Sequence, residues 1–189
     1  MKARGVVTRT VWIGALLGAL LPSMSQAQVL SNTGTVNLNA SLAQSLSLSI
    51  TSGSTVNFTL VNGGAADGDV PVVVHTTWNL NPLVVGAVTL YGYFSTPTQA
   101  LADGTGNYIT SASVRGRMTT GTPVTYLPFS QTNVVGPAAG SLLLYAQLVT
   151  ALNAVSNRTD NLDLRIDLTA LTIPSGTYTG VLTLQARSI

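Results

Sequence analysis

Apolar and polar residues alternate in steps of two along most of this chain. The first clear run is Val36, Leu38, Ala40 and Leu42, and two more follow at 46–50 and 56–60, with serine, threonine and asparagine between the apolar positions. This period places one face of a β-strand against a core and the other face in water. Each run therefore predicts a strand.

Residues 72–80 are the strand best suited to anchor a core. Val72, Val74 and Trp78 share one face, and His75 lies on the opposite face. Trp78 is the largest apolar side chain of this set, so we expect it to be a central contact between two sheets.

The middle of the chain gives weaker patterns. Residues 84–95 are apolar on both faces, which predicts a central or covered strand, and residues 109–118 form a weaker strand. Residues 119–140 contain three prolines and several glycines, with a short strand expected at 124–127. Irregular stretches of this length are uncommon unless they have a role.

The last third predicts three elements. Residues 141–150 and 162–171 are expected to form an antiparallel pair, with a turn at 153–158 between them. Residues 143–155 also fit helical spacing, so a short helix there is an alternative. Pro174-Ser175-Gly176 then predicts the last turn before a C-terminal strand.

Eight or nine short strands with turns every eight to twelve residues are typical of one architecture. They predict an all-β fold, an immunoglobulin-like antiparallel β-sandwich. No internal repeat divides the chain, so residues 28–189 are expected to form a single domain.

The first 27 residues have a different pattern. Lys2, Arg4 and Arg9 precede an apolar run from Val11 to Leu21, and small residues follow at 25–27. This order is typical of a secretory signal peptide, and the apolar run is too short to span a bilayer. We expect cleavage before Gln28, an extracytoplasmic location (periplasm, cell surface or medium) and no transmembrane segment in the mature chain.

Removing this leader changes the charge balance. The mature chain has five arginines against six aspartates, so its formal charge is −1, and it contains no lysine, glutamate or cysteine. A basic face for nucleic acid is therefore not supported. The domain must hold together by packing and strand pairing, without disulfides.

No catalytic pattern is present. His75 is the only histidine, and no nucleophile-elbow motif accompanies it. One histidine without cysteine does not make a usual zinc site. We therefore expect a protein that is not an enzyme and needs no cofactor.

Two binding chemistries remain open. Asp67, Asp69 and Asp103 lie in glycine-containing loops that suit calcium, although Asp-Gly is also common in ordinary turns. Tyr91 and Tyr93 are candidates for sugar binding. Asp163, Arg165 and Asp167 share an outward face, where cross-strand ion pairing is the simplest expectation.

The C-terminal run carries a family resemblance. Residues 173–184, Ile-Pro-Ser-Gly-Thr-Tyr-Thr-Gly-Val-Leu-Thr-Leu, resemble the last strand of secreted bacterial pilin-like domains of the spore coat protein U and fimbrial type. Gly176 is fourteenth from the end, as glycine is in many such subunits, whereas Ser188 replaces their usual tyrosine and their cysteine pair is missing. The resemblance implies assembly through Gly176, Tyr178, Leu182 and Leu184.

A subunit of this type lacks one strand and accepts the N-terminal segment of a neighbour. Residues 28–42 are the candidate donor here, with Val36, Leu38, Ala40 and Leu42 as the inserted side chains. The alternative, which the pattern alone favours, is that this stretch forms the first strand of its own domain.

Together these features predict a structural or adhesive protein at the cell surface. Its expected partners are copies of itself or other surface subunits, assembled by strand donation as in a pilus. The competing hypothesis is a monomeric extracellular module that binds carbohydrate or calcium.

Overall fold

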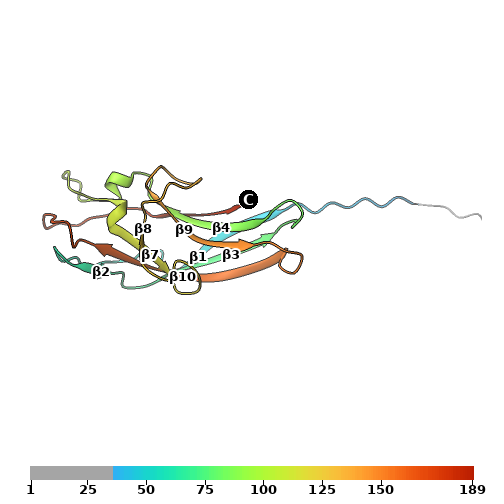
Figure 1. Ribbon diagram of the computed structural model, residues 1–189, viewed down its shortest axis with the longest axis horizontal. Helices are drawn as coiled ribbons and strands as arrows, with labels where there is room; N and C mark the ends of the chain where they lie inside the picture. The colour runs from blue at the N-terminus through green and yellow to red at the C-terminus, as the bar shows by residue number, and fades with distance from the viewer. Residues whose placement is uncertain (1–35) are drawn as a thin grey trace, which may run out of the picture. The chain divides into compact units, whose positions relative to one another are not determined.

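The computed structural model describes residues 36–189, and residues 41–189 form one compact unit. This unit is an antiparallel β-sandwich, as predicted (Figure 1). The expected signal peptide and residues 28–35 lie outside the described residues.

The larger sheet is built around a long central strand. Its order is β1 (Ser45–Ser52), β3 (Val72–Asn79), β10 (Val155–Asp167), β7 (Val114–Met118) and β8 (Leu127–Pro128). A short strand, β2 (Ala65–Asp67), pairs with the end of β10 beyond the last residue that pairs with β3. Thus β1 is an edge strand of this sheet.

The smaller sheet has the order β11 (Thr183–Ser188), β4 (Ala87–Tyr93) and β9 (Ser141–Leu148). The remaining elements are a ribbon of β5 (Leu101–Ala102) with β6 (Tyr108–Ile109), and two 3-10 turns, η1 (Pro97–Gln99) and η2 (Ser111–Ser113). No helix in residues 36–189 is long and apolar enough to cross a membrane.

Side-chain faces follow the sequence pattern closely. In β3, Val72, Val74 and Trp78 point into the core, while His75 lies on the other face and is half-buried. Trp78 is near one end of β3 rather than at its centre, and its Nε1 donates to the Asn153 carbonyl at 2.8 Å. The apolar strand predicted at 84–95 is β4, which is the middle strand of the smaller sheet and is buried on both faces.

One predicted pairing is wrong. Residues 141–150 and 162–171 do not pair, because β9 joins β4 in the smaller sheet whereas β10 joins β3 and β7 in the larger one. The turn between them carries the chain from one sheet to the other, and β10 begins at Val155, inside the predicted turn 153–158. The helical alternative at 143–155 is also wrong, since its first half is strand β9.

The N-terminal prediction needs a second correction. The first strand begins at Ser45, and residues 36–44 belong to no strand. Val36, Leu38 and Leu42 are 82%, 90% and 83% exposed, so the run 36–42 is not a buried first strand. Residues 56–60 form only one bridge, from Phe58 to Gly68, although their apolar side chains face the core as expected.

The long irregular stretch 119–140 supplies a core residue. Phe129 is fully buried, and its ring meets Phe94 edge-on with centroids 5.4 Å apart. Gly92 and Gly116 make room for it, because a Cβ on either residue would lie within 3.1 Å of the Phe129 ring. Of this stretch, only Leu127–Pro128 is a strand, shorter than the predicted 124–127 and offset from it.

Candidate functional site: an apolar groove between two sheet edges

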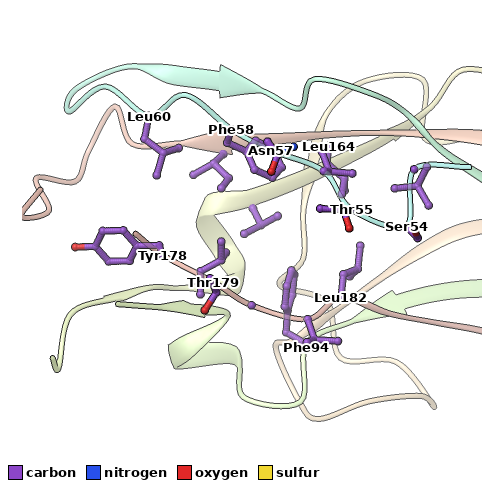
Figure 2. Close-up of a pocket in the computed structure, with 18 of the residues that line it drawn as sticks. Ser54, Thr55, Asn57, Phe58, Leu60, Phe94, Leu164, Tyr178, Thr179 and Leu182 are labelled. Carbon is purple, nitrogen blue, oxygen red and sulfur yellow. The ribbon is translucent and has the colours of Figure 1, made fainter. Parts of the chain in front are cut away.

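The sandwich is incompletely closed along one side. A groove of about 670 Å³ runs between the segment that follows β1 and the segment that leads into β11. Figure 2 shows Phe58 and Leu60 on one wall and Tyr178 and Leu182 on the other. Core side chains form its floor, among them Phe94, Val114, Leu164 and Ile166.

Both walls carry apolar side chains that are only half covered, with uncharged polar side chains such as Thr55, Asn57 and Thr179 between them. Val56, Phe58 and Leu60 on the first wall are packed against the core but are not fully buried, and the same holds for Leu182 and Leu184 on the second. No charged side chain lines the groove. Partly covered apolar side chains on two facing walls indicate space for a further apolar segment.

Each wall also adjoins an edge strand of its sheet. β1 is the last strand of the larger sheet and β11 is the last strand of the smaller one. Edge strands carry backbone N–H and C=O groups that are free to pair with another chain. An extended segment in this groove would therefore meet backbone partners and apolar side chains together.

Hydrogen bonds between Asp69 and Asn57 hold the first wall in place. Asp69 accepts hydrogen bonds from the Asn57 backbone N–H and from Asn57 Nδ2, both at 2.9 Å. The Asp69 N–H donates to the Asn57 carbonyl at 3.1 Å. Hydrogen bonds from Asn57, largest from its side chain, lower the pKa of Asp69.

The second wall depends on a close backbone approach. Thr179 and Ala102 exchange two hydrogen bonds of 2.9 Å, and a Cβ on Gly180 would lie 2.0 Å from the Ala100 carbonyl oxygen. Gly180 is thus the glycine that this wall requires. At Gly176, singled out from the sequence, a Cβ would make only ordinary contacts at 3.7 Å or more.

The structure brings four of the predicted assembly residues together. Gly176, Tyr178, Leu182 and Leu184 all line the groove. The other four, Val36, Leu38, Ala40 and Leu42, lie in the segment before β1 and are all exposed. The C-terminal set thus lines the groove, and the N-terminal set is an exposed apolar run that belongs to no strand.

The candidate calcium ligands accept hydrogen bonds from other residues of the protein. Asp67 takes two hydrogen bonds from the Arg165 guanidinium, which lowers the pKa of this carboxyl, and Asp69 holds Asn57. Asp103 accepts bonds from Thr105 and Asn107, and the Asn107 side chain is the main cause of its strongly lowered pKa. In residues 36–189, no three histidine, aspartate, glutamate or cysteine side chains gather into a metal-binding group.

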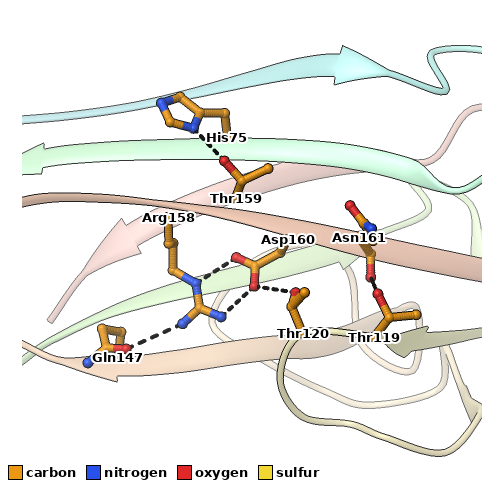
Figure 3. Close-up of polar contacts among 8 residues, drawn as sticks. All are labelled: His75, Thr119, Thr120, Gln147, Arg158, Thr159, Asp160 and Asn161. Atoms are coloured by element: carbon orange, nitrogen blue, oxygen red, sulfur yellow. Dashed lines mark hydrogen bonds and ion pairs between the residues drawn. The ribbon is translucent and has the colours of Figure 1, made fainter.

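The other candidates have structural roles. Tyr91 is buried in β4, and Tyr93 is covered by Gly136. His75 Nδ1 lies 2.9 Å from Thr159 Oγ1 (Figure 3). The tyrosines are thus not arranged as an open sugar-binding face.

The predicted ion pairing on the outward face of β10 is confirmed. Asp163 pairs with Arg117 and Asp167 pairs with Arg115, each at 3.0 Å. The sequence did not reveal that the Tyr126 ring lies against two cations, with Arg117 and Arg165 at 4.8 and 4.2 Å from its centroid. Such cation–π contacts stiffen a surface that is otherwise only weakly stabilised by exposed ion pairs.

A polar cluster inside the sandwich was also missed. Figure 3 shows Arg158 and Asp160 of β10 pointing toward Gln147 of β9 and Thr120. Asp160 is 1% exposed, and Arg158 is the last residue of the predicted turn 153–158. The sequence did contain a signal for this cluster. Arg158 and Asp160 precede Leu162 and Leu164 in steps of two, so all four share the inward face of the strand.

No family model matches the chain, and no curated protein and no solved structure matches it either. The groove and the segment before β1 are therefore the observations from which a function is argued.

Proposed function

We propose that this protein is a secreted, non-enzymatic structural subunit that assembles by strand donation. The apolar segment 36–42 of one copy enters the groove between β1 and β11 of the next copy. The observation that carries this proposal is the uncharged apolar groove between two sheet edges.

The donor segment fits the chemistry of the groove. Its apolar residues are two apart, so in an extended conformation Val36, Leu38, Ala40 and Leu42 face the same way. Full burial of each valine or leucine contributes about 1.5–3 kcal/mol. Backbone pairing with the two edges adds affinity, and the spacing of the side chains sets the register.

Chain length favours donation to another copy over insertion into the same domain. Leu42 is three residues from Ser45, which limits its reach to about 11 Å. The groove begins at Ile50, five residues along β1 and therefore about 17 Å from Ser45. Leu42 thus falls short of the groove in its own domain, so Val36, Leu38, Ala40 and Leu42 can enter a groove together only in a neighbouring copy.

The test compares two double variants of the chain that begins at Gln28. Leu38→Asp with Leu42→Asp places two charges on the inserted face, and Asn37→Asp with Asn39→Asp places the same charges on the opposite face. All four positions are exposed, so both variants are expected to fold. Sedimentation velocity is expected to show assemblies for the parent and for the asparagine variant, and monomers for the leucine variant.

A peptide of residues 28–44 provides the second measurement. The monomeric leucine variant retains an empty groove and is expected to bind this peptide, whereas a peptide carrying Leu38→Asp and Leu42→Asp is expected not to bind. A parent chain that is a stable monomer and does not bind the peptide would contradict the proposal.

A further inference from the structure

One end of the sandwich carries a cluster of exposed apolar side chains, which we call the apolar pole. Leu152 is 98% exposed and Leu83 is 92% exposed, and the other members are Val84, Leu148, Val155 and Ile189. Backbone hydrogen bonds tie these segments into one end of the unit: Leu80 N–H to the Ala154 carbonyl, Val149 N–H to Gly86, and Gly86 N–H to Ile189.

The chain before β1 leaves the unit at this pole. Ser45, the first residue of β1, pairs with Asn79, and Asn79 pairs on its other side with Val155. Only Ala43 and Gln44 separate Leu42 from Ser45. If Leu42 enters a neighbour's groove, the pole must lie within about 11 Å of that neighbour, because the connecting chain is no longer than this.

The surface that the pole would meet is the rim of the groove. Val61, which follows the first wall, and Val181, within the second wall, are 68% and 76% exposed. Neither the wall segments 50–62 and 174–184 nor the pole segments 79–89 and 146–157 contain a charged side chain. Two apolar surfaces without charged side chains can be buried against each other without desolvating a charged side chain.

We propose that the apolar pole is a second interface between copies, packed on the groove rim of the copy that accepts the donor segment. This inference rests on the proposed strand donation and extends it. The inserted segment supplies one contact and the pole supplies another, so the joint between two copies is stiffer and longer-lived than the inserted segment alone would make it.

The test separates the two contacts. Val84→Asp and Leu152→Asp place a charge on the pole, and Val134→Asp is the matched control, since Val134 is 66% exposed in the segment that precedes β9. Each change is made in the parent chain, where assembly is measured by sedimentation. Each is also made in the Leu38→Asp, Leu42→Asp chain, where binding of the 28–44 peptide is measured.

Pole substitutions are expected to weaken assembly about tenfold or more, as for a residue central to an interface, and to leave peptide affinity unchanged. Val134→Asp is expected to change neither. If the peptide binds but the pole variants assemble as well as the parent, the second interface is wrong and strand donation stands. If the peptide does not bind at all, strand donation fails and the second interface fails with it.

Discussion

Asp160 and Arg158 form an ion pair inside the sandwich, with Arg158 Nε donating to Asp160 Oδ2 at 2.6 Å. The two residues are two apart on β10, so both point toward the smaller sheet. There the guanidinium lies 3.9 Å from the centroid of the Tyr145 ring, and Thr120 Oγ1 donates to the carboxylate at 2.9 Å. The hydrogen bonds with Asp160 raise the pKa of Arg158, so its guanidinium is charged at every ordinary pH.

Removing the acidic partner should therefore destabilise the domain. Asp160→Asn is expected to lower the free energy of unfolding by about 2–3 kcal/mol, less than the 3–5 kcal/mol of a fully buried pair because Arg158 keeps some contact with water. Asp163→Asn is the matched control, since it breaks an arginine pair on the outward face of the same strand and should cost about 1 kcal/mol or less. Urea unfolding followed by Trp78 fluorescence measures both, and equal losses would contradict the interior role of Asp160.

These residues show what the sequence can predict and what it cannot. Alternation is a local property, so it placed Leu162, Leu164 and Ile166 on the inward face correctly. It contains no information on which strand lies beside which, so the partners of β10 were predicted wrongly. The same rule would have placed Arg158 and Asp160 inside, had asparagines nearby not suggested a turn.

The groove could not be predicted from the sequence either, because it too depends on which strands are neighbours. Its walls come from segments about 120 residues apart in the chain, and its existence depends on both being sheet edges. The sequence did identify the apolar runs of both the groove and the donor segment. It could not show that 36–42 lacks a strand of its own, because an unpaired apolar run and a first strand have the same alternation.

A second prediction concerns Trp78. The side chain is 4% exposed and donates to the Asn153 carbonyl, so Trp78→Ala removes a large buried contact and a hydrogen bond together. We expect a loss of about 3–5 kcal/mol in the free energy of unfolding. His75→Ala on the opposite face should cost about 0.5 kcal/mol. Circular dichroism is the suitable probe, because the variant loses the only tryptophan after residue 27. Similar losses for both variants would contradict the core position of Trp78.

A third prediction separates two glycines near the groove. Gly180→Ala forces a Cβ against the Ala100 carbonyl and should destabilise the domain by about 1–3 kcal/mol. Gly176→Ala meets no close neighbour, so its effect should stay within about 0.5 kcal/mol. Thermal unfolding of the two variants measures the difference, and a larger loss at Gly176 would show that the turn, rather than the close approach, constrains this wall.

A fourth prediction concerns the N-terminal leader. If residues 1–27 are a signal peptide, the exported protein begins at or near Gln28, and intact-mass spectrometry should show this mass. Replacing Ala27 with a bulky residue should slow cleavage, because the peptidase requires small residues there. Exported protein that retains Met1 would contradict the cleaved leader, and protein found only in the cytoplasm would contradict the extracytoplasmic location.

The last prediction is a loss of stability in acid. The Arg165 hydrogen bond lowers the pKa of Asp67, and the Thr169 side chain lowers that of Asp167. A carboxyl whose pKa is lower in the folded state than the unfolded value of about 3.9 stabilises the fold above that pH. This contribution is lost as the pH falls through the folded-state pKa, so the free energy of unfolding should decline from about pH 4 to pH 2. Urea unfolding at pH 6, 4, 3 and 2 measures the decline.

Arginine variants identify the groups responsible for this decline. Arg165→Leu removes the main cause of the lowered pKa of Asp67, so stability should fall less steeply between pH 4 and pH 2 than in the parent. Arg187→Leu removes a guanidinium that has no carboxylate partner among residues 36–189, and it should leave the slope unchanged. If Arg165→Leu keeps the slope of the parent, the pair with Asp67 makes no contribution in acid, and the source is Asp69, Asp167 and the Asp103 loop.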